Sequence, residues 1–136
     1  MDMLINFPGG ARVDAHFKGF TVQTDQPAAS GGQDAAPTPF DYFLASLGTC
    51  AGFYISGFCR SRGIPTDNLR LVQKNEFDPT THALTHVSFD IQLPADFPER
   101  YKAAVIRAAE MCKVKKQLEQ PPTFQIETSA LEPTFA

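Results

Sequence analysis

Residues 37–65, PTPFDYFLASLGTCAGFYISGFCRSRGIP, carry the strongest structural signal in the sequence. Thr38 is a favourable N-cap and Pro39 suits the first position of a helix. Asp41 falls three residues after the cap, where a carboxylate complements the helix dipole. The segment therefore predicts a helix that runs to about residue 62, where a glycine and then a proline end it.

Apolar side chains occupy nearly every face of this predicted helix. A helix that is apolar all round is normally surrounded by protein. In a chain of 136 residues, one sheet cannot wrap it fully, so we infer a partner subunit. The apolar positions are Phe40, Phe43, Leu44, Leu47, Ala51, Phe53, Tyr54, Ile55 and Phe58.

Shorter patterns on both sides of the helix predict strands and a second helix. The second helix is expected at residues 98–118, with Asp96 and Glu99 forming a capping-box pattern at its start. Strands are expected at residues 11–17, 20–24, 69–77, 85–93 and 124–128, and the segment 26–39 is predicted to be loop. The order ββ-α-ββ-α-β indicates an α+β fold with antiparallel pairing, in a single domain that covers residues 1–136.

Composition and charge exclude several classes of protein. The chain is 43% hydrophobic and 20% charged, which is ordinary for a globular protein. Its net charge of -3 provides no basic footprint, so we expect neither nucleic acid nor a membrane surface as a partner. The N-terminal sequence MDMLINFPGG lacks the basic start and long apolar run of a secretory signal, and no segment is expected to span a membrane.

The three cysteines point to thiol chemistry in a reducing compartment. An odd count with no CxxC pair argues against a secreted disulfide framework, so we expect a cytoplasmic protein. Cys50 and Cys59 lie nine positions apart on one predicted helix, on opposite faces and roughly 13 Å apart along its axis. Any partner for Cys50 within the chain must therefore be Cys112. Most buried free cysteines are inert. Lys113 and Lys115 lie close to Cys112 in the sequence, and they are either solvated, as lysines at a helix end usually are, or lower the pKa of a thiol.

Two segments resemble the OsmC/Ohr family of osmotically inducible and organic hydroperoxide resistance proteins. Residues 37–65 resemble the first-cysteine helix of that family, and AAEMCKVKKQL, residues 108–118, resembles its second-cysteine motif. In the second motif Lys113 replaces the usual proline and Lys115 the usual serine. The spacing of the two cysteines and the order of elements agree with the family as well.

The resemblance implies an intertwined homodimer in which sheets from both chains enclose the central helices. It also implies a cysteine-based peroxidase, with Cys50 as the attacking thiolate and Cys112 as the resolving thiol. An organic hydroperoxide would be the substrate and an external dithiol the reductant, with no metal or organic cofactor.

The peroxidases of this family use an arginine and a glutamate to activate the first cysteine. Arg12 resembles the arginine position of the Ohr branch, and Asp41 best fits the acidic position. Asp41 faces away from Cys50 on its own helix, so it would serve the partner subunit's site. Both residues have an alternative interpretation. Arg12 is then a solvated residue of a strand, and Asp41 is a carboxylate that stabilises the start of its helix.

Two further functions compete with the peroxidase. One is a non-catalytic protein that binds a small hydrophobic ligand in the dimer cleft, and the other is a redox sensor or persulfide carrier based on Cys50. A metal site has little support, because His82 and His86 have ligand-like spacing only on a helix and lie in a predicted turn and strand. Cys59 is assigned to packing under all of these hypotheses.

Overall fold

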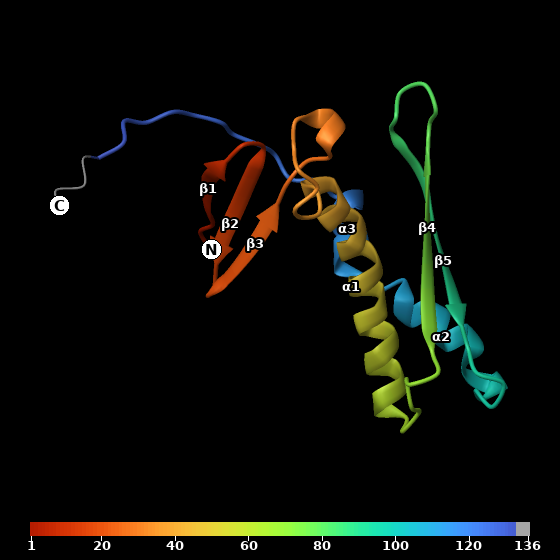
Figure 1. Ribbon diagram of the computed structural model, residues 1–136. Helices are drawn as coiled ribbons and strands as arrows, with labels where there is room; N and C mark the ends of the chain where they lie inside the picture. The colour runs from red at the N-terminus through yellow and green to blue at the C-terminus, as the bar shows by residue number, and fades with distance from the viewer. Residues whose placement is uncertain (133–136) are drawn as a thin grey trace.

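The computed structural model describes residues 1–132 and has an α+β fold with two antiparallel sheets and three α-helices (Figure 1). The predicted fold class is confirmed. One sheet has three strands in the order β1-β2-β3, and the other has the two strands β4 and β5. The long helix α1 lies between the two sheets, with the other helices against it (Figure 1).

Helix α1, Pro39–Ser61, begins as the sequence predicts. The backbone N–H of Asp41 donates to the Thr38 hydroxyl at 3.1 Å, and the backbone N–H of Thr38 donates to the Asp41 carboxylate at 3.0 Å. This reciprocal pair is a capping box, which satisfies two of the backbone donors left free at a helix start.

The three-stranded sheet contains β1, Leu4–Gly9, β2, Arg12–Phe17, and β3, Phe20–Thr24. The hairpin of β2 and β3 was predicted, but β1 was not. The LINFPG sequence of β1 includes a proline, which cannot donate to a ladder and argues against a central strand. Because β1 lies at the edge of the sheet, the proline is tolerated there.

The second sheet is a long hairpin of β4, Arg70–Phe77, and β5, Leu84–Gln92, close to the predicted ranges. Its turn is organised by the Asp78 carboxylate, which accepts backbone N–H groups from Thr80 and Thr81, both at 2.8 Å. Figure 1 shows the turn end of this hairpin projecting away from the helices.

The predicted continuous helix over residues 98–118 is wrong in detail. The structure has a 3-10 turn at Glu99–Tyr101, then α2, Lys102–Ala109, and α3, Lys113–Glu119. No side-chain cap precedes the 3-10 turn, so the capping box of Asp96 and Glu99 is also wrong. The helix breaks because Cys112 leaves helical geometry and its Sγ accepts the backbone N–H of Lys115 at 3.4 Å, as an N-cap residue does.

The predicted last strand, residues 124–128, is not paired in any ladder of the described chain. The segment runs on from α3 past the three-stranded sheet (Figure 1), and its apolar side chains are exposed, Phe124 by 87% and Ile126 by 95%. The alternation of apolar side chains that predicted a strand is therefore present, but a ladder partner is missing within this part of the chain.

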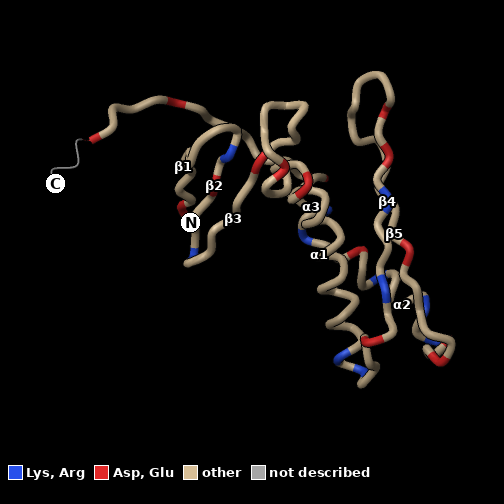
Figure 2. The backbone as a smooth tube through the Cα atoms, viewed as in Figure 1, with Lys and Arg blue, Asp and Glu red and all other residues tan. Residues whose placement is uncertain are grey.

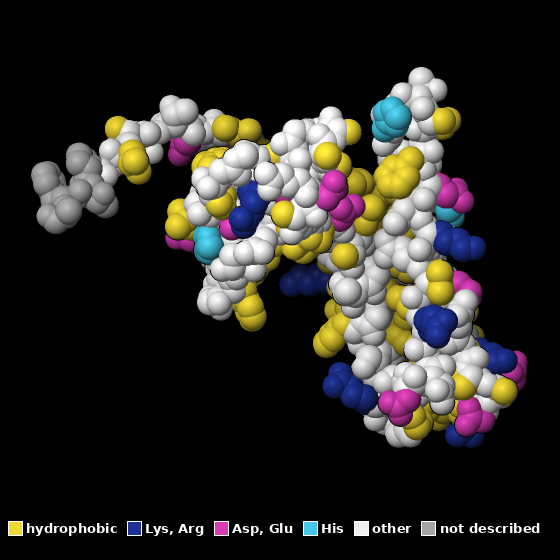
Figure 3. Space-filling model, viewed as in Figure 1, with side chains coloured by type: hydrophobic (Ala, Val, Ile, Leu, Met, Phe, Trp, Pro, Cys, Tyr) yellow, Lys and Arg dark blue, Asp and Glu magenta, His cyan; other side chains and the backbone are white. Residues whose placement is uncertain are grey.

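The buried core lies where the C-terminal half of α1 meets α2. Its fully enclosed members are Ile55, Cys59, Phe97 and Val105. The remainder of α1 is much less covered, with Phe40 and Phe53 exposed, and apolar side chains reach the surface over several elements (Figure 3). Acidic and basic residues are interspersed along the chain (Figure 2).

Helix α1 is long and apolar enough to cross a membrane by length and composition. The core helix of a globular fold has the same properties. Elements α2, α3 and β4 pack against α1, and 22% of its most apolar stretch is buried within the described chain.

Candidate functional site

The two thiols singled out in the sequence meet where α1 contacts the start of α3. Cys112 Sγ lies 3.8 Å from the backbone oxygen of Leu47, which is one helical turn before Cys50 on α1. Cys50 and Cys112 lie near enough for each thiol to influence the pKa of the other. Cys112 is buried and Cys50 is half-buried, so the first thiol is enclosed while the second is partly accessible.

The surroundings of Cys50 favour its thiolate. Burial opposes ionisation, but the backbone N–H of Val114 and the thiol of Cys112 act in the other direction and lower the pKa of Cys50. The backbone N–H and the positive charge of Lys113 lower this pKa further. Hydrogen bonds and a nearby cation stabilise a thiolate, which is the nucleophilic form of cysteine.

The pKa of Cys112 is raised. Burial raises the pKa of this thiol, and the neighbouring Cys50 raises it further, although the backbone N–H of Lys115 opposes them. The two neighbouring thiols therefore shift in opposite directions, and opposite shifts in neighbouring titratable groups are typical of groups with different chemical roles.

Cys59 is separated from this pair. It is completely buried in the core of α1 and α2, and burial raises the pKa of its thiol. The expectation that Cys59 serves packing agrees with these surroundings.

Arg12 lies on β2, and within the chain it contacts acidic residues. Its guanidinium pairs with the Asp14 carboxylate at 3.4 Å, and its charge also helps to lower the pKa of Asp25, which backbone N–H groups of Gln26 and Ala35 lower more strongly. The second oxygen of the buried Asp14 carboxylate, Oδ1, has no hydrogen-bond partner in the part of the chain described. The structure does not bring Arg12 to Cys50 within one chain.

Asp41 is exposed and forms the capping box of α1 with Thr38. It stands nine positions before Cys50 on the same helix, and within the chain it does not act on that thiol. Of the four predicted site residues, the structure brings together Cys50 and Cys112, and it places Arg12 and Asp41 elsewhere in the chain.

An apolar groove opens beside Cys112. It has a volume of about 640 Å³ and runs between β5, α2 and α3, with Leu47 and Cys112 among its lining residues. Its walls are mainly aliphatic, with Phe89 among them, and two acidic and two basic residues also line it: Asp90, Glu110, Lys102 and Lys115. Cys50 is not part of the lining, so the groove reaches the pair of thiols from the side of Cys112.

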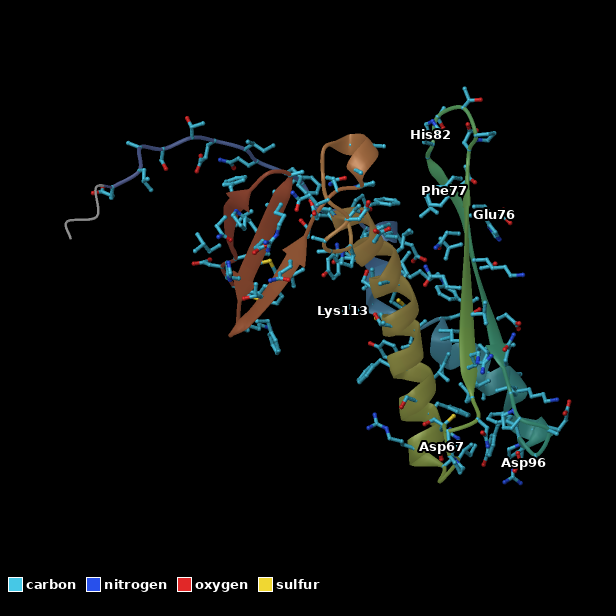
Figure 4. All side chains as sticks on the ribbon, in the orientation of Figure 1. Asp67, Glu76, Phe77, His82, Asp96 and Lys113 are labelled. Atoms are coloured by element: carbon cyan, nitrogen blue, oxygen red, sulfur yellow. The ribbon has the colours of Figure 1, made fainter. Side chains whose placement is uncertain are left out.

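Metal-ligating side chains do not gather in the described residues. Within residues 1–132, no group of three histidine, cysteine or acidic side chains is arranged to hold a metal ion. His82 lies in the turn of the long hairpin and His86 on β5, and Figure 4 shows His82 at the end of the hairpin, far along it from the helices.

Sequence reasoning missed the contribution of the α3 backbone to the site. The N–H groups of Lys113 and Val114 act on Cys50 only because the chain breaks its helix at Cys112. The departure from the second-cysteine motif at Lys113 was visible in the sequence. The break itself had no visible signal, because no glycine or proline marks it.

Comparison with known proteins identifies the family. The family profile described as OsmC-like protein matches residues 31–127, which include both Cys50 and Cys112. None of the curated proteins compared with the chain matches it.

Solved structures share the fold. The chain is similar to a protein from Psychrobacter arcticus 273-4 described as an osmotic stress induced and detoxification response protein, with 20% identity, a TM-score of 0.71 and coverage of 85% of each chain. An OsmC-like protein from Mycoplasma pneumoniae is 13% identical, with a TM-score of 0.67 and coverage of 88% of this chain and 87% of that one.

A third similar structure is an organic hydroperoxide resistance protein OsmC from Legionella pneumophila. It is 15% identical, with a TM-score of 0.54 and coverage of 87% of this chain and 89% of that one. The family profile covers most of the chain and the structures agree with it in fold, so the protein belongs to the OsmC family.

Proposed function

We propose that this protein reduces organic hydroperoxides by thiol chemistry, with Cys50 as the attacking thiolate and Cys112 as the resolving thiol. The observation that supports this most strongly is the placement of Cys112 Sγ against α1, 3.8 Å from the backbone oxygen of Leu47 and one turn from Cys50, where the pKa of Cys50 is lowered and that of Cys112 raised. The name of the Legionella pneumophila protein, an organic hydroperoxide resistance protein, agrees with the proposal.

The proposed reaction has three balanced steps. The Cys50 thiolate attacks the terminal oxygen of the hydroperoxide, so an S–O bond forms, the O–O bond breaks and the alcohol leaves after taking up a proton. Cys112 then attacks the sulfenic acid of Cys50, which forms a disulfide and releases water. An external dithiol reduces this disulfide and is itself oxidised to a disulfide.

The surroundings of the thiols favour an organic substrate over hydrogen peroxide. Apolar residues of α1 flank Cys50, and the groove beside Cys112 is mainly apolar. An apolar group bound there is removed from water, which stabilises its complex in proportion to the area buried. Hydrogen peroxide has no such group.

A homodimer is part of the proposal. The exposed apolar side chains on α1 and beyond it, among them Phe40, Phe53 and Phe124, form surface that a second copy of the chain would cover. Arg12 and Asp41 act on the site only from the partner subunit in this proposal, because they lie away from Cys50 within one chain. Three free cysteines suit the reducing cytoplasm in which we place the protein.

The first test is consumption of cumene hydroperoxide by the reduced protein in the presence of a dithiol, with Cys50→Ser and Cys112→Ser measured in parallel. We expect Cys50→Ser to abolish turnover. Cys112→Ser should still consume about one equivalent of peroxide in the first step. If the wild type consumes no more peroxide than Cys50→Ser, the peroxidase proposal is wrong for this substrate.

Mixed dimers test whether Arg12 acts across the subunit interface. In a dimer of one Cys50→Ser subunit and one Arg12→Ala subunit, the only reactive Cys50 belongs to the subunit that lacks Arg12. If Arg12 acts from the partner, this dimer keeps about half of the wild-type activity, whereas homodimers of either variant are inactive. Loss of all activity in the mixed dimer would place Arg12 in the same subunit as the Cys50 it serves.

The apolar groove supports a second candidate function, the binding of a small hydrophobic molecule without catalysis. Equilibrium binding of a fluorescent apolar probe to Cys50→Ser separates the two functions. A binding protein would retain full affinity while the wild type shows no turnover, whereas the proposed enzyme shows turnover that depends on Cys50.

A further inference from the structure

The apolar groove gives the two thiols different access from outside the chain. The side chain of Cys112 is only 3% exposed, yet Cys112 is one of the residues that line the groove. Cys50 does not line it, although Leu47, one helical turn before Cys50 on α1, does. A molecule in the groove therefore reaches the pair of thiols at Cys112.

The place of Cys112 between α1 and the groove follows from the break between α2 and α3. Cys112 is the N-cap residue of α3, and its Sγ lies 3.8 Å from the backbone oxygen of Leu47 on α1. Helix α2 ends at Ala109 and α3 begins at Lys113, and residues of both helices form walls of the groove. The residue that contacts α1 on one side thus borders the groove on another.

We propose that the external dithiol enters this groove and attacks the sulfur of Cys112, and not that of Cys50, when it reduces the disulfide between them. This inference rests on the proposed function and assigns the place and the order of its reductive step. The alcohol is released from the hydroperoxide before the disulfide forms, so the groove is free for the reductant at this stage.

The reductive step consists of two thiol–disulfide exchanges. A thiolate of the reductant attacks Cys112 Sγ, so a bond forms between these two sulfurs, the bond between Cys112 and Cys50 breaks, and Cys50 leaves as a thiolate. The second thiol of the reductant then attacks the reductant's own sulfur in the mixed disulfide and releases Cys112. The reductant is oxidised to a disulfide, and of the two protons that it loses, one goes to Cys112 and the other to water.

Two physical requirements of this exchange favour attack at Cys112. The three sulfurs must lie nearly in a line, and a thiolate in the groove has Cys112 between itself and Cys50, because Cys112 lines the groove and Cys50 does not. A leaving sulfur of lower pKa also leaves faster, and the pKa of Cys50 is the lowered one. Attack at Cys50 would instead expel Cys112, whose pKa is raised.

The competing route is attack at Cys50 through the surface of α1, because Cys50 is half-buried. The exposed apolar side chains of α1, among them Phe53, are surface that a second copy covers in the proposed homodimer. Among the described residues, α1 contributes only Leu47 to the lining of the groove. Contacts of a second copy with the rest of α1 therefore do not by themselves close the groove.

The experiment identifies the cysteine that forms the mixed disulfide. The reduced full chain is oxidised with one equivalent of cumene hydroperoxide, treated briefly with 2-mercaptoethanol and quenched with N-ethylmaleimide, which blocks free thiols. One molecule of this monothiol cannot complete the second exchange, so the mixed disulfide is trapped. Mass spectrometry of unreduced chymotryptic peptides locates each modification, because cleavage after Phe53 separates Cys50 from Cys59.

A variant that fills the groove tests the route. Ile106 lines the groove from α2 and is 54% exposed, so Ile106→Trp adds bulk to the groove outside the buried core. Ala103→Trp is the matched control, because Ala103 is an exposed residue of α2 that does not line the groove. Reduction of the disulfide by 2-mercaptoethanol and oxidation of the thiols by hydrogen peroxide are timed for both variants. A thermal unfolding curve for each checks that the fold is kept.

We expect the mercaptoethanol adduct on Cys112 in at least about tenfold excess over Cys50, which should carry N-ethylmaleimide. Ile106→Trp should slow the reduction by about fivefold and leave the oxidation unchanged, since hydrogen peroxide has no apolar group to place in the groove. Ala103→Trp should match the wild type in both reactions.

An adduct mainly on Cys50, or equal amounts on both cysteines, would overturn the inference and leave the peroxidase proposal intact. Unchanged reduction in Ile106→Trp would also overturn it, because the reductant would then reach the disulfide by another route. If cumene hydroperoxide is consumed but no disulfide between Cys50 and Cys112 forms, this inference and the resolving role of Cys112 both fail.

Discussion

The middle of α1 and its C-terminal end each carry a cysteine, and the surroundings of the two residues shift the thiol pKa in opposite directions. Cys50 meets polar N–H groups and a positive charge at the start of α3, which lower its pKa. Cys59 is enclosed by apolar side chains of α1 and α2, and burial raises its pKa. The difference arises from the neighbouring elements, because both residues have the same backbone geometry on one helix.

The largest expected effect is on chemical reactivity. In the folded, reduced protein, iodoacetamide should modify Cys50 at least about 100-fold faster than Cys59 at neutral pH, because Cys50 has more thiolate and is more accessible. Mass spectrometry of labelled peptides over time measures both rates. In denaturing urea the two rates should become equal, and similar rates in the folded protein would contradict the comparison.

Much of this contrast was accessible from the sequence. The cap at Thr38, the apolar pattern of α1 and the spacing of the cysteines predicted the long helix and its two opposite faces. They also left Cys112 as the possible partner of Cys50, and the structure places the two thiols together.

Other features depend on contacts that no local pattern records. The break at Cys112 is stabilised by the packing of α3 on α1, and the edge position of β1 explains why its proline is tolerated. The role of Arg12 was not predictable in detail either, because its contact with Asp14 is set by the side chains of β2, and a second subunit would decide what else it reaches.

The second effect concerns stability. Cys59→Ala should lower the free energy of unfolding by about 1–2 kcal/mol, because it leaves a cavity in a fully buried site. Cys50→Ala should cost under about 1 kcal/mol, since Cys50 is only half-buried. Urea unfolding of both variants under reducing conditions measures the difference. An equal loss would mean that the site around Cys50 is packed as tightly as the core.

The start of α1 should affect stability but not the reactivity of Cys50, because Asp41 and Thr38 form the capping box there. Thr38→Ala should lower the free energy of unfolding by about 1 kcal/mol, because the side-chain acceptor for the Asp41 N–H is lost. Cys50 alkylation should not change, since the cap lies three turns away from that thiol. A fall in Cys50 reactivity in Thr38→Ala would show that the position of α1 at the site depends on its cap.

The smallest effect is the pH dependence of stability, and its sign should differ between the two cysteines. The folded state lowers the pKa of Cys50, so the stabilisation from its thiolate is present above the ordinary thiol pKa and is lost as the pH falls through the lowered value. The folded state raises the pKa of Cys59, so its contribution is present below the ordinary pKa and is lost as the pH rises towards the raised value. The cost of Cys50→Ala should therefore grow between about pH 6.5 and pH 9.5, while the cost of Cys59→Ala should shrink.

Urea unfolding of the reduced wild type and both variants at these two pH values checks the prediction. Comparison of each variant with the wild type at the same pH removes the contributions of all other titrating groups that the substitution leaves unchanged. If both costs changed in the same direction, the two thiols would not have opposite pKa shifts. The division of α1 into a reactive middle and an inert end would then rest on solvent access alone, because a buried thiol reacts slowly whatever its pKa.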